Sequence, residues 1–362
     1  MSLTADEATA DVAELLFLEP GELDRRLDLR EQGLDSVRTM ELVDRWRRAG
    51  VSDISFVLLA EDRRLERWLD LLREMQGGGA AGAAPAGDAR LRTCIATVSL
   101  GGTLAEKLDA AAAAGFDGVE LLDADLQGSP LPAADVAARC AELGLSIDLY
   151  QPFRRAEGLG AAEFDDALTR FRGELDVMAE LGTSSILVVS NTEADADPDP
   201  DVSARQLATL ADTAAARGMT VTFEALAWGT HIGRLSEAWD VARRADHPAL
   251  TVAVDTFHLI CRGEGAGTVA EVPTEKISLV QVSDAPWRTG DLAQWSRNHR
   301  CLPGDGEFDL AGPLAAVLAG GYRGPLSLEL FDPDLRRRDP AEVAARGAAA
   351  LKKLVDRAGA GV

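Results

Sequence analysis

The sequence has 362 residues, which is too long for one small domain but enough for a barrel of roughly 250 residues and a second module. Hydrophobic residues make up 46% of the chain but fall in short runs, and none approaches the ~18 consecutive apolar residues of a membrane span. The net charge of −23 disfavours a partner as negative as nucleic acid.

The first segment, residues 1–76, has a helical pattern. It opens with acidic residues and no basic stretch before an apolar run, so we expect no secretory signal, no membrane contact and a cytoplasmic location. Leu65, Trp68, Leu69 and Leu72 follow the i, i+3, i+4, i+7 spacing of a helix buried on one face. About four short helices fit this length, one of them over about residues 36–48. The segment is therefore predicted to be a small all-α four-helix domain.

A linker follows the helical segment. Residues 77–87 contain only Gly, Ala and one Pro, which offer no side chain able to nucleate a core. We therefore predict a flexible Gly/Ala linker over residues 77–90.

Residues 91–362 alternate between predicted strands and predicted helices. Strands are expected near residues 93–100, 118–123, 145–150, 184–190, 219–225, 250–255, 277–283 and 325–331. Glycine recurs where a helix ends before the next strand, as in AELGLSIDLY and AARGMTVTFE. Eight such units predict an α/β domain with the (β/α)8 TIM barrel fold. The connection between the sixth and seventh strands is short and Gly-rich, so its helix is the least well defined.

Four oxygen-bearing side chains come at the ends of the last four predicted strands: Glu224, Asp255, Gln281 and Glu329. Barrel enzymes place their working residues at these ends, so the four side chains are expected to meet. Three carboxylates and an amide form an oxygen-only set that suits Mg²⁺, Mn²⁺ or Co²⁺ better than a structural Zn²⁺. The alternative is that these acids cap helices or pair with arginines.

Three histidines and two arginines fall on the same side of the predicted barrel, with His299 in the loop after the seventh predicted strand. His258 lies three residues after Asp255, where its imidazole could act as a general base or as a hydrogen-bonding neighbour of the metal ligands. His231 lies in the loop after the fifth predicted strand. Arg154 and Arg300 could hold an anionic substrate group or form salt bridges at the rim.

The barrel motifs resemble those of a known group of enzymes. YQPFR, FEALAWGTHI, VDTFH, QVSDAP and LPGDGEFDL, with the spacing of the four oxygen ligands, resemble bacterial 3-dehydroshikimate dehydratases of the xylose-isomerase-like barrel superfamily. The resemblance covers nearly all of residues 92–355. It implies dehydration of 3-dehydroshikimate to protocatechuate (3,4-dihydroxybenzoate) through a metal-stabilised enediolate.

The same resemblance implies roles for individual residues. His258 would be the general base, with His231 or the metal-bound carboxylate of Glu224 as alternatives. Arg300, together with Ser296, would bind the substrate carboxylate, and Arg154 would complete the rim. Some of these dehydratases have a histidine two residues after the first metal ligand, where this chain has Leu226.

Ser36 is the candidate reactive residue of the first segment. It follows a Gly-Leu-Asp turn at the start of a predicted helix, a position that favours a phosphodiester but is also an ordinary helix cap. GLDSVR, DISFVLLA and WLDLL resemble the aryl carrier domain of siderophore isochorismatases. This resemblance implies 4′-phosphopantetheine attached to Ser36.

Carrier function would require a phosphopantetheinyl transferase and an aryl adenylation enzyme as partners, and it suggests a role in siderophore or secondary-metabolite biosynthesis. Two alternatives remain for the whole chain. The barrel could be a sugar or cyclitol isomerase or epimerase on the same metal scaffold, or an inactive barrel in a carrier scaffold. The sequence leaves the oligomeric state open, a homo-oligomer included.

Overall fold

The computed structural model describes residues 3–16, 18, 21–25, 27–30, 32–34, 38–39, 42–43, 45–46, 49, 51, 54, 59, 63–76 and 91–359. The chain divides into two compact units, residues 1–87 and residues 88–362, and each is described by itself. The predicted linker, residues 77–90, and the attachment site predicted at Ser36 both lie outside the described residues.

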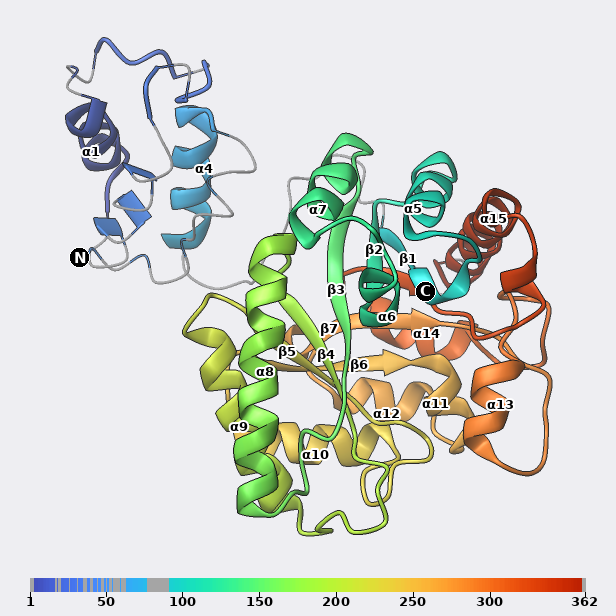
Figure 1. The fold of residues 1–362 in the computed structure, drawn as a ribbon. Helices are drawn as coiled ribbons and strands as arrows, with labels where there is room; N and C mark the ends of the chain where they lie inside the picture. Colours follow the sequence, from blue (N-terminus) through green and yellow to red (C-terminus); the bar gives the residue numbers. More distant parts are fainter. Residues whose placement is uncertain are drawn as a thin grey trace. The chain divides into compact units, whose positions relative to one another are not determined.

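The first unit is helical, as predicted from its apolar spacing. Helices α1 (Ala5–Leu16) and α4 (Leu65–Gln76) bury their apolar faces in a shared core, and the described residues between 38 and 46 are also helical (Figure 1). Trp46 and Trp68 meet edge to face in this core, with ring centroids 6.1 Å apart. Each indole N–H has an acceptor, Asp11 Oδ2 for Trp46 and the Leu59 carbonyl for Trp68. The buried edges of both rings are therefore satisfied.

The second unit is a closed barrel of eight parallel strands, which confirms the predicted fold class. Each strand pairs with the next in sequence, and the last pairs with the first. The strands are β1 Thr93–Ala96, β2 Gly118–Leu122, β3 Ser146–Phe153, β4 Ser185–Val189, β5 Thr220–Glu224, β6 Leu250–Asp255, β7 Ile277–Val282 and β8 Leu326–Leu328.

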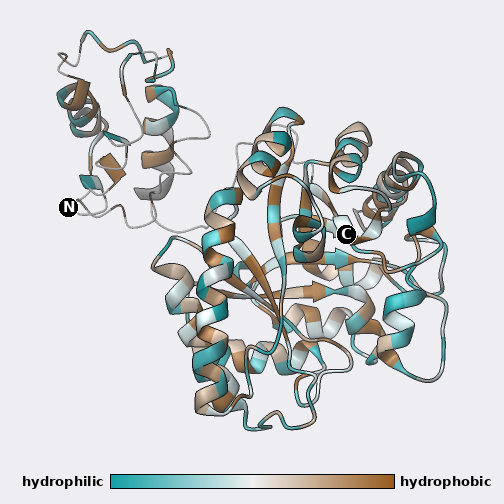
Figure 2. Cartoon of the chain, in the orientation of Figure 1, coloured by the Kyte–Doolittle hydropathy of each residue, from teal (hydrophilic) through white to brown (hydrophobic). Residues whose placement is uncertain are grey.

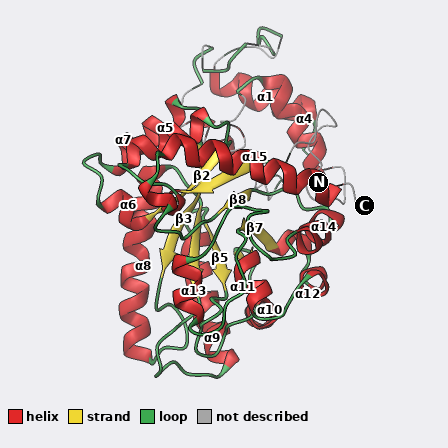
Figure 3. Ribbon diagram, turned by 90° about the vertical axis from the view of Figure 1, so that its right-hand side faces the viewer, coloured by secondary structure: helices red, strands yellow, loops and turns green. Residues whose placement is uncertain are grey.

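Helices surround the strands, as the turned view shows (Figure 3). They alternate hydrophobic and hydrophilic residues, as expected for helices that cover a barrel (Figure 2). The helices are α5 Leu104–Ala113, α6 Asp123–Gln127, α7 Ala133–Glu142, α8 Ala161–Leu181, α9 Pro200–Ala215, α10 Leu235–Ala245, α11 Thr256–Cys261, α12 Ala266–Glu271, α13 Leu292–Asn298, α14 Ala311–Ala319 and α15 Pro340–Gly359, with 3₁₀ turns at Thr97–Ser99, Thr274–Lys276 and Leu335–Arg337. The uncertain connection after the sixth strand forms two short helices, α11 and α12.

Two strands are shorter than predicted, for a shared reason. β1 ends at Ala96, where a 3₁₀ turn begins, and β8 ends at Leu328. The hydroxyl of Ser99 donates to the Leu328 carbonyl and accepts from the Leu330 N–H. This side chain replaces the strand pairing at that point, so Glu329 lies just after β8.

The glycines between helices and strands have the conformation that the sequence pattern predicts. Gly182 ends α8 and Gly218 lies in the turn after α9, with φ of 69° and 70°. This left-handed region is strained for residues with a Cβ, so glycine ends the helix and turns the chain toward the next strand.

Two apolar clusters stabilise the barrel, one inside the ring of strands and one between the strands and the helices. The inner cluster contains Leu149, Leu187, Val189, Leu226, Ala253 and Leu279, with Trp228 packed against it. A larger cluster fills the space between the strands and the surrounding helices. No helix among the described residues is long and apolar enough to cross a membrane.

Candidate metal and substrate site

The structure places the four predicted metal ligands at the carboxyl ends of neighbouring strands. Glu224 and Asp255 are the last residues of β5 and β6, Gln281 lies in β7, and Glu329 follows β8 directly. Asp255 and Gln281 are register partners across β6 and β7. All four side chains are buried, with exposed fractions between 0% and 4%.

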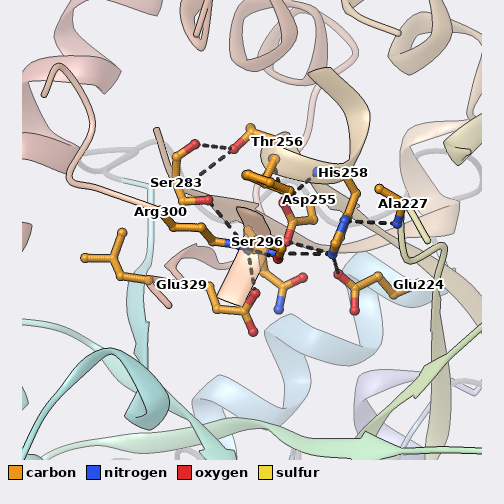
Figure 4. A network of polar contacts seen from close by, with 12 residues as sticks. Glu224, Ala227, Asp255, Thr256, His258, Ser283, Ser296, Arg300 and Glu329 are labelled. Atoms are coloured by element: carbon orange, nitrogen blue, oxygen red, sulfur yellow. Dashed lines mark hydrogen bonds and ion pairs between the residues drawn. The ribbon is translucent and has the colours of Figure 1, made fainter. Parts of the chain in front are cut away.

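The guanidinium of Arg300 lies among these carboxylates (Figure 4). Its Nη1 donates to Asp255 Oδ2 at 2.7 Å and to Glu329 Oε2 at 2.9 Å. Its Nε and Nη2 donate to Ser296 Oγ at 3.1 and 2.9 Å. Arg300 is only 1% exposed, so it is an internal partner of the predicted ligands and not a rim residue.

Negative charge exceeds positive charge in this cluster. Glu224, Asp255 and Glu329 are buried close to Arg300, the one buried arginine of the described residues, and Glu120 on β2 is buried close to Glu329 and Asp255. Burial raises the pKa of Glu224 well above its ordinary value, and Asp255 and Glu329 add to the effect. Burial, partly offset by Arg300, raises the pKa of Glu329 to about 7.

Asp255 behaves differently because its partners favour its ionised form. Burial opposes ionisation, but Arg300, His258 and the Phe257 N–H outweigh it and lower the pKa of Asp255. Its Oδ1 accepts from the backbone N–H groups of Phe257 and His258, capping the start of α11. These bonds fix Asp255 Oδ1 on the helix and leave Oδ2 facing the cluster.

Two buried oxygen atoms of the predicted ligands have no hydrogen-bond partner, Glu224 Oε1 and Gln281 Oε1. A buried polar atom without a partner is costly, and so is an excess of buried negative charge. A divalent cation with oxygen ligands would relieve both costs. The residues present therefore fit a hard divalent cation held by Glu224, Asp255, Gln281 and Glu329.

His258 lies against the same cluster and offers an alternative ligand. Its Nε2 is 3.5 Å from Glu224 Oε1 and 3.7 Å from Asp255 Oδ2, and these three side chains form a geometric group that could hold a metal ion. Its ring meets Trp228 edge to face at 5.1 Å. Burial, against the attraction of Asp255, lowers the pKa of His258 to about 3, so its neutral form dominates near neutral pH.

Both imidazole nitrogens of His258 face N–H groups. Nδ1 accepts from the Ala227 N–H at 3.1 Å, and Arg300 Nη2 lies 3.1 Å from Nε2. A neutral imidazole carries a proton on one nitrogen and can accept at the other only. The tautomer with an unprotonated Nε2 therefore carries its proton on Nδ1, and it loses the hydrogen bond from the Ala227 N–H.

A cavity of about 500 Å³ opens beside this cluster. Glu224, His258 and Glu329 line it, as do the predicted substrate-binding residues Ser296 and Arg300. Its wall contains four arginines, which are Arg154, Arg297, Arg300 and Arg336. Arg154 is exposed at this cavity, as expected for a rim residue.

The structure does not place His231 at the cavity. Its Nε2 lies 2.9 Å from the buried Glu157 Oε2 and 3.0 Å from Ser203 Oγ. Glu157 also accepts from the Ser203 hydroxyl and the Asn191 N–H. These contacts tie together the loops after β3, β4 and β5, so the geometry gives His231 a structural position.

Three further residues of the site, Glu120, Gln151 and Trp228, were not predicted from the sequence. Glu120 and Gln151 are buried on β2 and β3, and Gln151 and Trp228 line the cavity. The available signal for Glu120 was a carboxylate in the apolar strand GVELL. Such a residue is either paired or functional.

Comparison with known proteins identifies the family of the barrel. The profile of the xylose isomerase-like TIM barrel family matches residues 108–354. The chain belongs to this family. A solved xylose isomerase-like TIM barrel/4-hydroxyphenylpyruvate dioxygenase fusion protein is 44% identical with a TM-score of 0.73, over 74% of this chain and 43% of that one.

Two curated relatives of the barrel have the same name. The chain is 45% identical over 267 residues to a 3-dehydroshikimate dehydratase of Pseudomonas putida and 49% identical over 249 residues to one of Pseudomonas aeruginosa. The matches cover 73% and 68% of this chain but 42% and 39% of those proteins. The chain therefore spans less than half the length of these relatives.

The N-terminal segment has relatives of its own. The chain is 43% identical over 76 residues to the acyl carrier protein ScoB of Streptomyces coeruleorubidus, covering 21% of this chain and 88% of ScoB. It is 44% identical over 69 residues to an isochorismatase of Bacillus subtilis, covering 19% of this chain and 22% of that protein. These matches agree with the predicted resemblance to a carrier domain.

The four-oxygen ligand set can be tested against the alternative set that includes His258. Asp255→Asn is expected to lose stoichiometric Mn²⁺ binding, because it removes the negative charge of one of the four proposed ligands. His258→Asn is expected to keep Mn²⁺ binding, because it leaves all four oxygen ligands in place. The Mn²⁺ content is measured after gel filtration, with circular dichroism as the folding control. Loss of Mn²⁺ from His258→Asn would instead make the imidazole a ligand.

The structural position of His231 predicts a pH-dependent stability. The hydrogen bond from His231 to Glu157 raises the pKa of His231. A raised pKa in the folded state stabilises the protein below the unfolded value of about 6.5, and this stabilisation is lost as pH rises through the folded value. The Tm difference between the native protein and His231→Asn should therefore shrink as pH rises above about 6.5. A difference independent of pH would contradict this assignment.

Proposed function

We propose that the barrel is a metal-dependent 3-dehydroshikimate dehydratase that forms protocatechuate. The observation that carries the proposal is the identity of 45–49% to two proteins of that name, over 267 and 249 residues. The four candidate ligands lie within residues 108–354, the range that the family profile matches. The cavity chemistry supports it, because Arg154, Arg297 and Arg336 line the cavity in addition to Arg300 and favour a substrate with an anionic group over a neutral sugar.

Glu224, Asp255, Gln281 and Glu329 would hold the metal, and Mg²⁺, Mn²⁺ and Co²⁺ suit these oxygen ligands. When bound, such a cation supplies Lewis-acid polarisation of the substrate ketone and so acidifies the adjacent C4 hydrogen. The protein contributes by burying the ligand oxygens at the strand ends, where water competes little for them.

His258 would remove the C4 proton. It is buried, lines the cavity and is neutral near neutral pH, as a base must be. To accept the proton at Nε2 it must carry its own proton on Nδ1, which costs the Ala227 contact, and the substrate proton must displace the Arg300 Nη2 contact at Nε2. The C5 hydroxyl then leaves as water, and tautomerisation gives the aromatic diol.

Arg300 and Ser296 would bind the substrate carboxylate, with Arg154 at the rim. Ser296 Oγ already accepts from two nitrogens of Arg300, so both groups line the same part of the cavity. The guanidinium lies between the rings of Phe257 and Phe331, at 4.7 and 5.1 Å. This stacking restricts its plane, and a substrate carboxylate would take the place of one of its present partners.

The N-terminal domain, residues 1–76, would be an aryl carrier with 4′-phosphopantetheine on Ser36. Support comes from the GLDS motif and from the acyl carrier and isochorismatase relatives. A phosphopantetheinyl transferase would install the arm, and an aryl adenylation enzyme would load it with the dihydroxybenzoate. The product would be an aryl-capped secondary metabolite such as a catecholate siderophore, made in the cytoplasm.

The dehydratase proposal is tested by ultraviolet detection of protocatechuate from purified protein, Mn²⁺ and 3-dehydroshikimate. EDTA should abolish turnover, and added Mg²⁺, Mn²⁺ or Co²⁺ should restore it. Arg300→Ala at saturating Mn²⁺ should mainly raise KM, with Arg300→Lys as the charge-retaining control. Turnover of a neutral ketose and none of 3-dehydroshikimate would overturn the proposal in favour of an isomerase or epimerase.

The carrier proposal is tested by the mass of the protein after incubation with coenzyme A and a phosphopantetheinyl transferase. The native protein should gain one phosphopantetheine, and Ser36→Ala should gain none. Ser36→Ala should keep its dehydratase rate, because the proposed substrate enters the barrel as a free acid. A native protein that gains no mass would make residues 1–76 a helical interaction module.

A further inference from the structure

Glu120 has no role in the account so far, although it is one of the most buried charged residues of the barrel. Its side chain is 0% exposed and points into the barrel from β2. Its Oε2 accepts two amide N–H bonds of 2.9 Å, from Gln281 Nε2 on β7 and from Gln151 Nε2 on β3. β1 and β8 lie between β2 and β7, so the bond to Gln281 crosses the barrel interior.

We propose that Glu120 is a positioning residue that fixes the amide of Gln281 with Oε1 directed at the metal. The two ends of an amide have nearly the same shape, so only its neighbours decide which end faces which way. A carboxylate oxygen accepts hydrogen bonds and attracts the NH₂ end. Gln281 Oε1 is then left facing away without a partner, as the structure shows. The inference rests on the metal site proposed above.

Glu120 reaches a second proposed ligand through Gln151. The Nε2 of Gln151 donates to Glu120 Oε2 and also to Glu329 Oε1, the latter at 3.1 Å. The same carboxylate therefore orients the amide that supports Glu329, and leaves Glu329 Oε2 on the side of Arg300. Glu120 on β2 therefore orients two of the four proposed ligands, Gln281 directly and Glu329 through Gln151.

The local backbone of β2 supports this assignment. The pairing of β2 with β3 shifts register between Val119 and Glu120, so Val119 pairs with Ile147 and Glu120 with Leu149. Such irregularities re-aim side chains and are common beside functional sites. Glu120 accepts hydrogen bonds from the amides of Gln281 and Gln151, so it acts through these two side chains.

The two hydrogen bonds that Glu120 accepts do not depend on its negative charge. Both amides donate to Oε2 of Glu120, so a proton on Oε1 would leave Oε2 free to accept both of them. A glutamine at this position would also offer one acceptor oxygen, whereas methionine would offer none. Glu120→Gln and Glu120→Met therefore separate the orienting hydrogen bonds from the charge.

The first test measures Mn²⁺ affinity by calorimetry on the full chain, with folding monitored by circular dichroism. Glu120→Met should lose ~10- to 100-fold in affinity, the range found for other supporting residues of metal sites, while Glu120→Gln stays near the native value. Equal losses in both variants would mean that Glu120 acts by its charge, and would overturn the proposal.

A double-mutant cycle tests whether the effect passes through the amides. In a Gln151→Met, Gln281→Ala background, Glu120→Met should cause no further loss of Mn²⁺ affinity. Additive losses would overturn the proposal. A different outcome would be that Gln281→Ala and Glu224→Ala each bind Mn²⁺ with the affinity of the native protein. That result would rule out the proposed metal site and not only the role of Glu120.

A charge swap keeps the proposal testable if Glu120→Met does not fold. Gln281→Glu adds a negative charge, which by charge alone would strengthen cation binding, but it removes the donor that Glu120 requires. We expect weaker Mn²⁺ binding in Gln281→Glu and recovery in the double variant Glu120→Gln, Gln281→Glu, where the amide and carboxylate exchange places. Stronger binding in Gln281→Glu, or no recovery in the swap, would contradict the orienting role.

Discussion

The excess of buried negative charge at the carboxyl end of the barrel is the constraint on which the rest of the site depends. Glu120, Glu224, Asp255 and Glu329 are nearly inaccessible to water, and Arg300 is the one buried arginine in the described part of the chain. Buried charges of one sign cannot stay ionised without compensation. The raised pKa values of Glu224 and Glu329 express this imbalance, and a divalent cation would remove it.

The fold sets the directions of these side chains before any ligand binds. Asp255 ends β6 and also caps α11, so its Oδ1 is held by two backbone N–H groups and its Oδ2 faces Arg300. Glu329 lies between Gln151 and Arg300, with one oxygen on each. Asp255 and Glu329 are therefore each held by hydrogen bonds to one carboxylate oxygen before a ligand binds. Binding then costs little further conformational entropy at these two side chains.

Much of this arrangement could be predicted from the sequence, because it follows from local patterns. Alternating strands and helices, with glycines such as Gly182 and Gly218 at the junctions, predict the barrel, and polar residues at the strand ends predict the four oxygen positions. Long-range contacts were not predictable in this way. Arg300 was expected at the rim, but α13 and the loop after it direct the guanidinium inward, between Phe257 and Phe331. The Glu120 bond to Gln281 joins residues 161 positions apart, and no local pattern encodes it.

The central claim is that one divalent cation binds the oxygens of Glu224, Asp255, Gln281 and Glu329. A crystal structure of the full chain with Mn²⁺, with anomalous scattering to locate the ion, tests it most directly. We expect one anomalous peak with all four oxygens at roughly 2.0–2.6 Å, the range of metal–oxygen bonds to hard cations. A peak bonded to His258 Nε2 in place of Gln281 Oε1, or no peak among these residues, would contradict it.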